Sequence, residues 1–551
     1  MEPTITIYCK NTKSYHEVER GISLSQLIDQ LHIQLTYPVI AARVNYKLEN
    51  LDFLLYKPKD VEFLDISSHS GHRCYVRTLI MVFACAVHEL YPEADLRLEH
   101  PICKGYYCTL QGKPLTPDMV KAIKERMLLI IKENRKIEEV EKQTKEVIRI
   151  FARQTDGKAT LFRTLGNPYC RYFRMDDYND YYMSVLMPST GYLNIFDIEP
   201  YYDGILLRVP SRTNPSQLEG TIRQDKMFKH FSEYRKWNKL MNISNVGDFN
   251  NLCDEGKSFE MIKLAEALHE KKVGQIADAI CNREGGYPKL VLISGPSSSG
   301  KTSFAQRLRI QLMVNGLKPL TVSMDNYFVN RVDTPKDENG EWDFEDINAL
   351  DLKLFRDHLD RMLRGEEVEM PYYSFEKGER EWRGDKIKME ADNILIVEGI
   401  HALNPSLIPN VPVALQYRIY VSVLTTINLD NHNWIPTTDI RLLRRIVRDY
   451  RTRGFSARET IARCPSVIRG EIKWIYPYQE EADAMFNSAL LFELAVLKQA
   501  AEPILAEVPK FCNEYAEAHR LIKFLQYFRP IPENQIPPTS LLRAFVGGGS
   551  H

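Results

Sequence analysis

A short loop at residues 295–302, with the sequence GPSSSGKT, constrains the fold of this chain more than any other feature. The apolar stretch before it, VLIS, has the pattern of a buried strand, and the segment after it, SFAQRLRIQLMV, has the pattern of a helix. In a GxxxxGK[ST] string the glycines let backbone N–H groups approach phosphate oxygens, and the helix N-terminus adds partial positive charge. The context predicts an α/β domain with a parallel sheet and a phosphate-binding loop. An ordinary Gly/Ser turn leaves the flanking strand and helix unexplained.

Lys301 and Thr302 have separate tasks in a loop of this type. The lysine ammonium neutralises the β and γ phosphate oxygens, and the threonine hydroxyl coordinates Mg²⁺. We therefore expect ATP and Mg²⁺ as cofactors. The expected nucleotide contacts are Gly295, Ser297, Ser298, Ser299, Gly300, Lys301, Thr302 and Ser303.

Two further strand-like stretches end in carboxylates. PLTVSMD ends at Asp325, and NILIVEG contains Glu398 at its end. Ligands of an open parallel sheet bind outside the carboxyl ends of its strands, so both side chains should face the phosphates. Asp325 suits a general base, because an attacking hydroxyl must lose its proton, and Glu398 suits a ligand of Mg²⁺. The alternative for each residue is a capping or ion-paired acid.

The stretch DIRLLRRIVRDYRTRG, residues 439–454, predicts a helix with a strongly basic face. The arginines on or beside this face are Arg441, Arg444, Arg445 and Arg448. A solvated helix with Arg445–Asp449 and Asp449–Arg453 pairs is the alternative. Acidic residues are few nearby, so we expect a mobile lid over the ATP phosphates, with Arg441, Arg445 and Arg448 joining Asp325 and Lys301 in catalysis.

In this order, these motifs resemble the uridine kinase and phosphoribulokinase family of P-loop kinases over residues 286–485. The remaining motifs are SMDNYF at 323–328, EWDFEDINALD at 341–351, PYYSF with Arg380, and ILIVEGIHAL. The resemblance implies a phosphotransferase with an alcohol acceptor: a nucleoside kinase that moves the γ-phosphate of ATP to a 5′-hydroxyl, as in pyrimidine salvage. It also suggests a homo-oligomer.

The same resemblance implies roles for individual residues at the substrate. Asp343 would bind the ribose hydroxyls, Tyr373 would stack near the base, and Arg441 would contact phosphate or nucleoside. The full set of expected substrate contacts is Asp325, Tyr327, Asp343, Tyr373, Arg380 and Arg441.

The sequence departs from the uridine kinase pattern where the base is read. The family's acid, imidazole, guanidinium and amide are replaced by Ser374, Gly378, Phe455 and Arg463. Losing polar partners in a pocket changes or relaxes its choice of substrate. We expect uridine or cytidine as the acceptor, and a kinase of another small metabolite is the alternative.

The front of the chain resembles a different family. Residues 1–66, with ERGISLSQLI, resemble the ubiquitin-like TGS domain, and residues 67–214 resemble the second additional (editing) domain of threonyl-tRNA synthetases, most visibly in MPSTGYLNIFDIEPYYDGILLRVP. Of the four metal ligands that editing requires in that family, His72 alone remains, because the second motif aligns on Tyr182 to Leu186. This α+β module is therefore expected to have a scaffold or binding role and to hold no metal.

The rest of the chain is assigned from its patterns. Within the editing-like module we expect a long charged helix at 117–149. Residues 215–285 predict a helical connector, 286–512 the kinase domain, and 513–551 a C-terminal tail, which is expected to be extended and lightly packed after Pro530.

Composition excludes several other classes of protein. The 551 residues include 72 basic and 73 acidic ones, a formal net charge of -1, which argues against a nucleic-acid partner. An RNA- or ribosome-associated regulator is the alternative, but residues 1–215 have no basic, aromatic stripe. No signal region and no membrane-spanning apolar run is recognised, and ten dispersed cysteines indicate reduced thiols. We therefore expect a cytoplasmic protein without a membrane partner.

Overall fold

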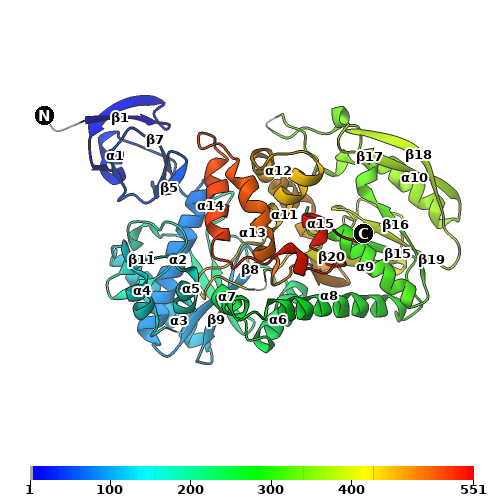
Figure 1. The fold of residues 1–551 in the computed structure, drawn as a ribbon, viewed down its shortest axis with the longest axis horizontal. Helices are drawn as coiled ribbons and strands as arrows, with labels where there is room; N and C mark the ends of the chain where they lie inside the picture. The colour runs from blue at the N-terminus through cyan, green and yellow to red at the C-terminus, as the bar shows by residue number, and fades with distance from the viewer. Residues whose placement is uncertain (1–3, 155–156, 339, 426, 551) are drawn as a thin grey trace.

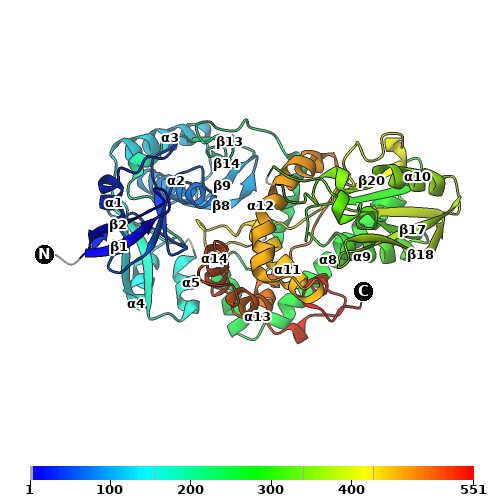
Figure 2. The same ribbon diagram turned by 90° about the horizontal axis from the view of Figure 1, so that it is seen from above.

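The computed structural model describes residues 4–154, 157–338, 340–425 and 427–550. The N-terminal half, residues 4–214, and the half that contains residues 286–485 lie at opposite ends of the molecule (Figure 1). Helices α13 (Glu493–Ala506) and α14 (Tyr515–Leu525) lie between them in both views (Figures 1 and 2). Within the described part of the chain, no helix combines the length and apolar character needed to cross a membrane.

The first module is a small mixed sheet packed on one short helix. Its sheet has the order β2-β1-β7-β4-β5, and a separate pair joins β3 to β6. Its elements are β1 (Thr4–Cys9), β2 (Ser14–Glu19), β3 (Ile22–Ser23), α1 (Leu24–Gln30), β4 (Ala41–Val44), β5 (Lys47–Glu49), β6 (Leu54–Leu55) and β7 (Asp60–Leu64). The Ser23 hydroxyl accepts from the Gln26 N–H, and the Gln26 side chain accepts from the Ser23 N–H. This capping box fixes the start of α1.

The second module is built around the buried helix α2, which packs on a sheet of order β13-β14-β9-β8. Its elements are α2 (His69–Leu90), β8 (Asp95–Ile102), β9 (Gly105–Gln111), α3 (Pro117–Lys132), β10 (Glu138–Gln143), α4 (Thr144–Phe151), α5 (Lys158–Leu165), β11 (Tyr169–Met175), β12 (Tyr178–Asp180), β13 (Asp197–Tyr201) and β14 (Gly204–Arg208).

The long charged helix expected at 117–149 is wrong. Helix α3 ends at Lys132, and the charged stretch after it is strand β10, which pairs antiparallel with β11. Arginines of β11 neutralise the glutamates of β10: Arg174 lies 2.7 Å from Glu138, and Arg171 lies 2.8 Å from Glu141. Opposite charges facing each other across strands stabilise this register. The helical reading failed because these partners lie about thirty residues away in the sequence.

The connector is helical, as its pattern predicts. Its last helix runs along the half that contains residues 286–485 (Figure 1). Its helices are α6 (Asp225–Leu240), α7 (Val246–Asp254) and α8 (Ser258–Cys281).

The predicted parallel sheet is confirmed. Five strands lie in the order β16-β19-β15-β20-β21, and every neighbouring pair is parallel. The strands are β15 (Leu290–Ser294), β16 (Lys318–Ser323), β19 (Asn393–Glu398), β20 (Gln416–Ser422) and β21 (Ala484–Asn487). The other elements of this half are α9 (Lys301–Val314), α10 (Leu352–Leu363), the hairpin β17 (Glu367–Ser374) and β18 (Glu379–Lys388), α11 (Thr437–Thr452) and α12 (Ala457–Trp474). This order brings the ends of β15, β16 and β19 together at one edge.

The C-terminal segment is packed, not extended and lightly packed as expected. After α14 the chain runs back over the half that contains residues 286–485. It ends in α15 (Arg543–Val546), which packs on α11. Ile531, Leu541 and Phe545 are buried in the same core as α11 and α13. Turn-forming prolines and glycines dominate the sequence of this segment, whereas its scattered apolar residues supply the buried area that holds it in place.

A buried ion cluster joins the two halves. Lys158, which is 0% exposed, lies 2.9 Å from Asp180 on β12 and 3.7 Å from Asp430 in the other half. His432 Nδ1 lies 2.9 Å from the same Asp180 carboxylate. Burial alone would raise the pKa of Asp180, but His432 and Lys158 lower it well below its ordinary value. The cluster therefore keeps charged groups buried at the contact between the halves.

Lys158→Met should destabilise the protein by about 3–5 kcal/mol, because it leaves two buried carboxylates without their cation. Urea denaturation followed by tryptophan fluorescence measures the loss. Lys145→Met is the matched control, since Lys145 is exposed on α4. Equal midpoints for the two variants would contradict a joining role for the cluster.

Candidate active site

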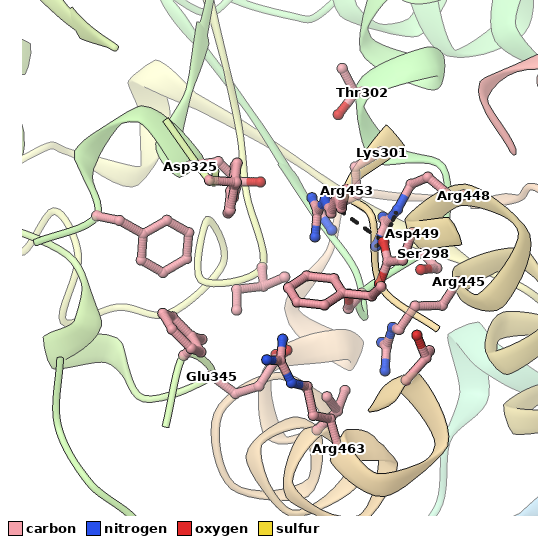
Figure 3. Close-up of a pocket in the computed structure, with 18 of the residues that line it drawn as sticks. Ser298, Lys301, Thr302, Asp325, Glu345, Arg445, Arg448, Asp449, Arg453 and Arg463 are labelled. Carbon is pink, nitrogen blue, oxygen red and sulfur yellow. Dashed lines mark hydrogen bonds and ion pairs between the residues drawn. The ribbon is translucent and has the colours of Figure 1, made fainter. Parts of the chain in front are cut away.

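A cavity of about 470 Å³ lies at the carboxyl edge of the parallel sheet. The loop after β15, the ends of β16 and β19, and helix α11 form its walls. Asp325 enters from one side and Arg445 and Arg448 from the other, with Lys301 and Thr302 at the loop (Figure 3). The sheet topology thus brings together groups that are far apart in the sequence.

Two glycines allow the loop its close turns. A Cβ on Gly295 would lie 2.1 Å from the carbonyl oxygen of Val421 on β20, so a side chain there would push the loop off the sheet. Gly300 has φ +84 and is the N-cap of α9, a conformation that favours glycine. The loop backbone is therefore seated directly at the helix N-terminus.

Most of the predicted nucleotide contacts line the cavity. They are Ser297, Ser298, Gly300, Lys301, Thr302 and Ser303. Gly295 and Ser299 belong to the same loop but do not line the cavity, and Ser299 is fully buried. Burial lowers the pKa of Lys301, and this is opposed by the carboxylates of Glu398, Asp325 and Glu345. A buried ammonium beside carboxylates is suited to hold phosphate oxygens.

The two predicted metal ligands are in contact. The Thr302 hydroxyl donates to Glu398 Oε1 at 3.1 Å, and the Ser323 hydroxyl donates to the same oxygen at 2.7 Å. Burial raises the pKa of Glu398, and the negative charge of Asp325 raises it further. The buried carboxylate of Glu398, the half-buried carboxylate of Asp325 and a hydroxyl form a hard-oxygen set that fits Mg²⁺, which is usually held by one or two carboxylates together with phosphates. The residues present fit this ion.

The basic face of α11 is divided between structure and site. Arg441 forms a bidentate ion pair with Glu471, and Arg444 forms one with Glu493. The sequence analysis predicted that the acids near these arginines are too few to neutralise them. Their partners come instead from α12 and α13, at least thirty residues away in the sequence. Arg441 is therefore held behind the loop, where it donates to the Ser297 carbonyl at 3.3 Å.

Arg445 and Arg448 line the cavity. Arg448 pairs with Asp449 at 2.8 Å, and Arg445 forms no ion pair or hydrogen bond with any residue that the structure describes. Burial is the main reason that the pKa of each arginine is lowered. An unpaired guanidinium facing a phosphate loop provides a site for an anion.

Only Asp325 and Tyr373 of the expected substrate contacts line the cavity. Tyr327 is buried, and its hydroxyl lies 3.1 Å from His358 Nδ1. Both terminal nitrogens of Arg380 donate to Asp351 Oδ2 at 3.0 Å. Asp343 lies just outside the cavity lining and accepts from the Glu345 N–H at 3.1 Å. Substrate contacts for these three residues stay predictions.

An aromatic wall lines the cavity, and of its residues the sequence analysis expected only Tyr373 as a substrate contact. Ring centroids of Phe328 and Tyr373 lie 5.5 Å apart, and those of Tyr373 and Phe375 lie 5.1 Å apart. Trp342, Phe344 and Phe455 also line the cavity. The signal was present in SMDNYF, EWDF and PYYSF, but aromatic residues in a sequence are more often core than site.

The C-terminal segment supplies a further wall that was not predicted. Ala544 and Phe545 line the cavity, and a Cβ on Gly300 would lie 2.8 Å from the side chain of Leu541. These contacts join residues more than two hundred positions apart, and no local pattern announces them.

Glu345 is a further lining residue that sequence reasoning missed. Burial, and then the neighbouring Glu471, raise its pKa to about 7, while Arg445 and Lys301 act in the opposite direction. One of its oxygens, Oε2, is buried and has no hydrogen-bond partner in the described structure. A carboxyl group that changes charge near neutral pH is a candidate for proton transfer or substrate binding.

Comparison with known proteins agrees with this geometry. Residues 290–491 match the model of the "Phosphoribulokinase / Uridine kinase family". The uridine kinase of Halobacterium salinarum is 29% identical over 29% of this chain and 63% of its own length. The uridine kinase of Brevibacillus brevis is 25% identical over 42% of this chain and 99% of its own length. Residues 290–491 are therefore similar to this family.

The N-terminal half is similar to another group. The threonine–tRNA ligase of Clostridium kluyveri is 29% identical over 34% of this chain, which spans 30% of that enzyme. The chain thus spans less than two thirds of the first relatives that it matches. Among solved structures, a possible uridine kinase from Bacillus stearothermophilus aligns with 27% of this chain and 79% of its own, with 20% identity and a TM-score of 0.24.

Glu345→Gln should change the pH dependence of stability. The pKa of Glu345 in the folded protein, about 7, lies above its ordinary value of 4.5, so the wild-type protein loses stability as pH rises through this range. The variant cannot ionise there. The melting temperature of the variant minus that of the wild type should be near zero at pH 5 and positive at pH 8.

Differential scanning fluorimetry across this pH range checks the result, with Glu341→Gln as the control because Glu341 is exposed in the same segment. The same pH-dependent gain in the control, or a constant difference for Glu345→Gln, would contradict the assignment.

Proposed function

We propose that this protein is an ATP- and Mg²⁺-dependent kinase that transfers the γ-phosphate to the 5′-hydroxyl of a nucleoside, uridine or cytidine. One observation carries the proposal: Asp325, the phosphate loop and an aromatic wall line the same cavity. A base, a phosphate site and a surface for a planar ring are the three parts that such a reaction needs. Similarity to uridine kinases supports the phosphotransferase class.

The residues divide the reaction between them. Asp325 accepts the proton of the attacking hydroxyl, and Lys301 with the loop N–H groups holds the phosphates. Thr302 and Glu398 hold Mg²⁺, which supplies charge neutralisation at the β and γ oxygens when it is bound. Arg445 and Arg448 face the transferred group from α11 and exclude water beside it.

The acceptor is held by aromatic contact more than by hydrogen bonds to its base. Tyr373 lies on the aromatic wall, and its buried hydroxyl has no partner among the described residues, so it is available to a substrate. The family's polar base-reading positions are occupied by Phe455 and Arg463, whose guanidinium lies 4.3 Å from the Phe455 ring centroid. Stacking accepts any planar base, so discrimination between bases should be modest.

A kinase of another small metabolite is the second candidate. A Cβ on Gly378 would lie 2.7 Å from the Arg331 guanidinium, so an arginine fills the space at the position of the family's imidazole. Arg331 also lines the cavity. A guanidinium there would favour an acidic acceptor over an uncharged base.

The acceptor is tested by ATP consumption against uridine, cytidine, adenosine, their 2′-deoxy forms, a sugar phosphate and threonine. The pyrimidine nucleosides should react, and adenosine should differ from them by no more than ~2 kcal/mol in kcat/KM, about one packing or hydrogen-bond contact. A preference for one base above ~10⁴-fold would show that the pocket reads the base. Activity on the sugar phosphate or threonine alone would favour the second candidate. Lys301→Ala should lose ~3 kcal/mol or more of transition-state stabilisation in every case.

Asp325→Asn and Glu398→Gln should fail in different ways. The first removes the base and should lower kcat by about 10²–10⁴ with little change in the KM for ATP. The second weakens a metal ligand and should raise the Mg²⁺ concentration needed for half-maximal rate. Mg²⁺ titrations of both variants, with the exposed Asp333→Asn as control, separate the roles. Identical Mg²⁺ curves for the two variants would reject this division.

A further inference from the structure

A second cavity, of about 780 Å³, lies between the N-terminal half and helix α14. Strand β5, helix α2, strand β11 and helix α14 contribute to its walls. Helix α14 lies beside α2 and β5 in Figure 1. None of its lining residues belongs to the proposed active site, so it needs an explanation of its own.

The lining of this cavity is strongly basic. Nine of its residues are lysine or arginine and three are glutamate, although the whole chain has a formal net charge of -1. Positive charge is therefore concentrated here. A concave surface lined by one sign of charge attracts the opposite charge.

Arg77 is a buried cation in the wall of this cavity. It is 6% exposed, it lines the cavity, and it forms no hydrogen bond or ion pair with any residue in the described ranges. Burial, and then the positive charges of Arg73 and Arg520, lower its pKa to about 10. A buried, unpaired cation is costly, so a chain that keeps one has a use for it.

The acids that pair with Arg73 and Arg520, the neighbours of Arg77, are already occupied. Asp439 accepts from Arg520 at 2.6 Å and lies 3.7 Å from Arg73. Glu517 lies 2.5 Å from Arg520 and 3.6 Å from Arg73. The surplus of positive charge is felt at His69, whose pKa falls to about 2, with Arg73 as the main cause. Nothing within this network is left to neutralise Arg77.

Two further cations and a ring line the same cavity. Lys47 on β5 and Lys523 on α14 line the cavity, and neither forms an ion pair with a described residue. Tyr169 lines the cavity and is 56% exposed, so its ring is open to a planar partner. Cations around an open aromatic ring match a phosphate attached to a nucleoside.

We propose that this second cavity binds a nucleoside phosphate, with its phosphates at Arg77, Lys47 and Lys523 and its base against Tyr169. The volume lies within the range of small-molecule sites, about 300–1,000 Å³. The inference does not depend on the proposed kinase activity, because its residues and its ligand contacts are separate from that site.

Isothermal titration calorimetry tests the site in the Lys301→Ala background, which weakens binding at the phosphate loop. The probes are UTP, pyrophosphate, uridine and a single-stranded RNA 12-mer. UTP should bind, and Arg77→Gln should weaken this binding at least tenfold, about the effect of one charge-assisted contact. The matched control is Arg163→Gln, because Arg163 is exposed on α5 outside the cavity. It should bind like its parent.

A stability measurement separates a ligand site from a structural role. Without ligand, Arg77→Met should keep or raise the melting temperature, because it removes an unpaired buried charge. A structural arginine would lower it. The proposal fails if UTP binds equally to the Arg77→Gln and parent proteins, if it does not bind the parent at all, or if only the RNA binds in an Arg77-dependent way.

Discussion

The buried pair of Arg444 and Glu493 holds together the parts on which the proposed active site depends. Arg444 is 0% exposed and forms a bidentate ion pair with Glu493 on α13 at 2.7 and 2.8 Å. Its guanidinium also donates to the carbonyls of Ser298 in the phosphate loop and of Ser488 after β21, and lies 4.9 Å from the ring of Phe545. One side chain thus ties α11 to the loop, to α13 and to the C-terminal segment. Removing either partner would leave an unpaired buried charge.

Helix α11 extends this connection to the other half of the molecule. Asp439 in its first turn belongs to the ion network with Arg73 and Arg520, whereas Arg445 and Arg448, two turns later, face the phosphate loop. Helix α11 therefore lines the first cavity and is tied through Asp439 to two arginines that line the second. A ligand that competes for Arg73 or Arg520 in the second cavity would act on Asp439, a residue of this helix. Helix α11 thus forms a contiguous physical connection between the two halves.

Features set by local sequence pattern could be predicted from the sequence. Features set by contacts between distant segments could not. The phosphate loop, its strand and helix, and the carboxylates at Asp325 and Glu398 depend on local pattern and on a general rule of parallel sheets, and the structure brings these groups to one cavity. The partners of Arg441 and Arg444, the strand at 138–143 and the wall formed by Phe545 depend on contacts between distant segments. Glu345 was missed for a related reason: its raised pKa comes from burial and from Glu471, and neither is visible in EWDFEDINALD.

Two arginines without partners, Arg77 and Arg445, have the same physical meaning in different places. Each is more than nine-tenths buried and lines a cavity, while neighbouring arginines such as Arg444 and Arg520 are fully paired. A chain that pairs its structural arginines so completely leaves these two cations exposed to a cavity at a cost in stability, and a bound anion would recover that cost. In the phosphate-loop cavity the anion is the phosphate that the loop implies. By the same reasoning, the basic cavity beside α2 has the charge that a phosphorylated ligand needs.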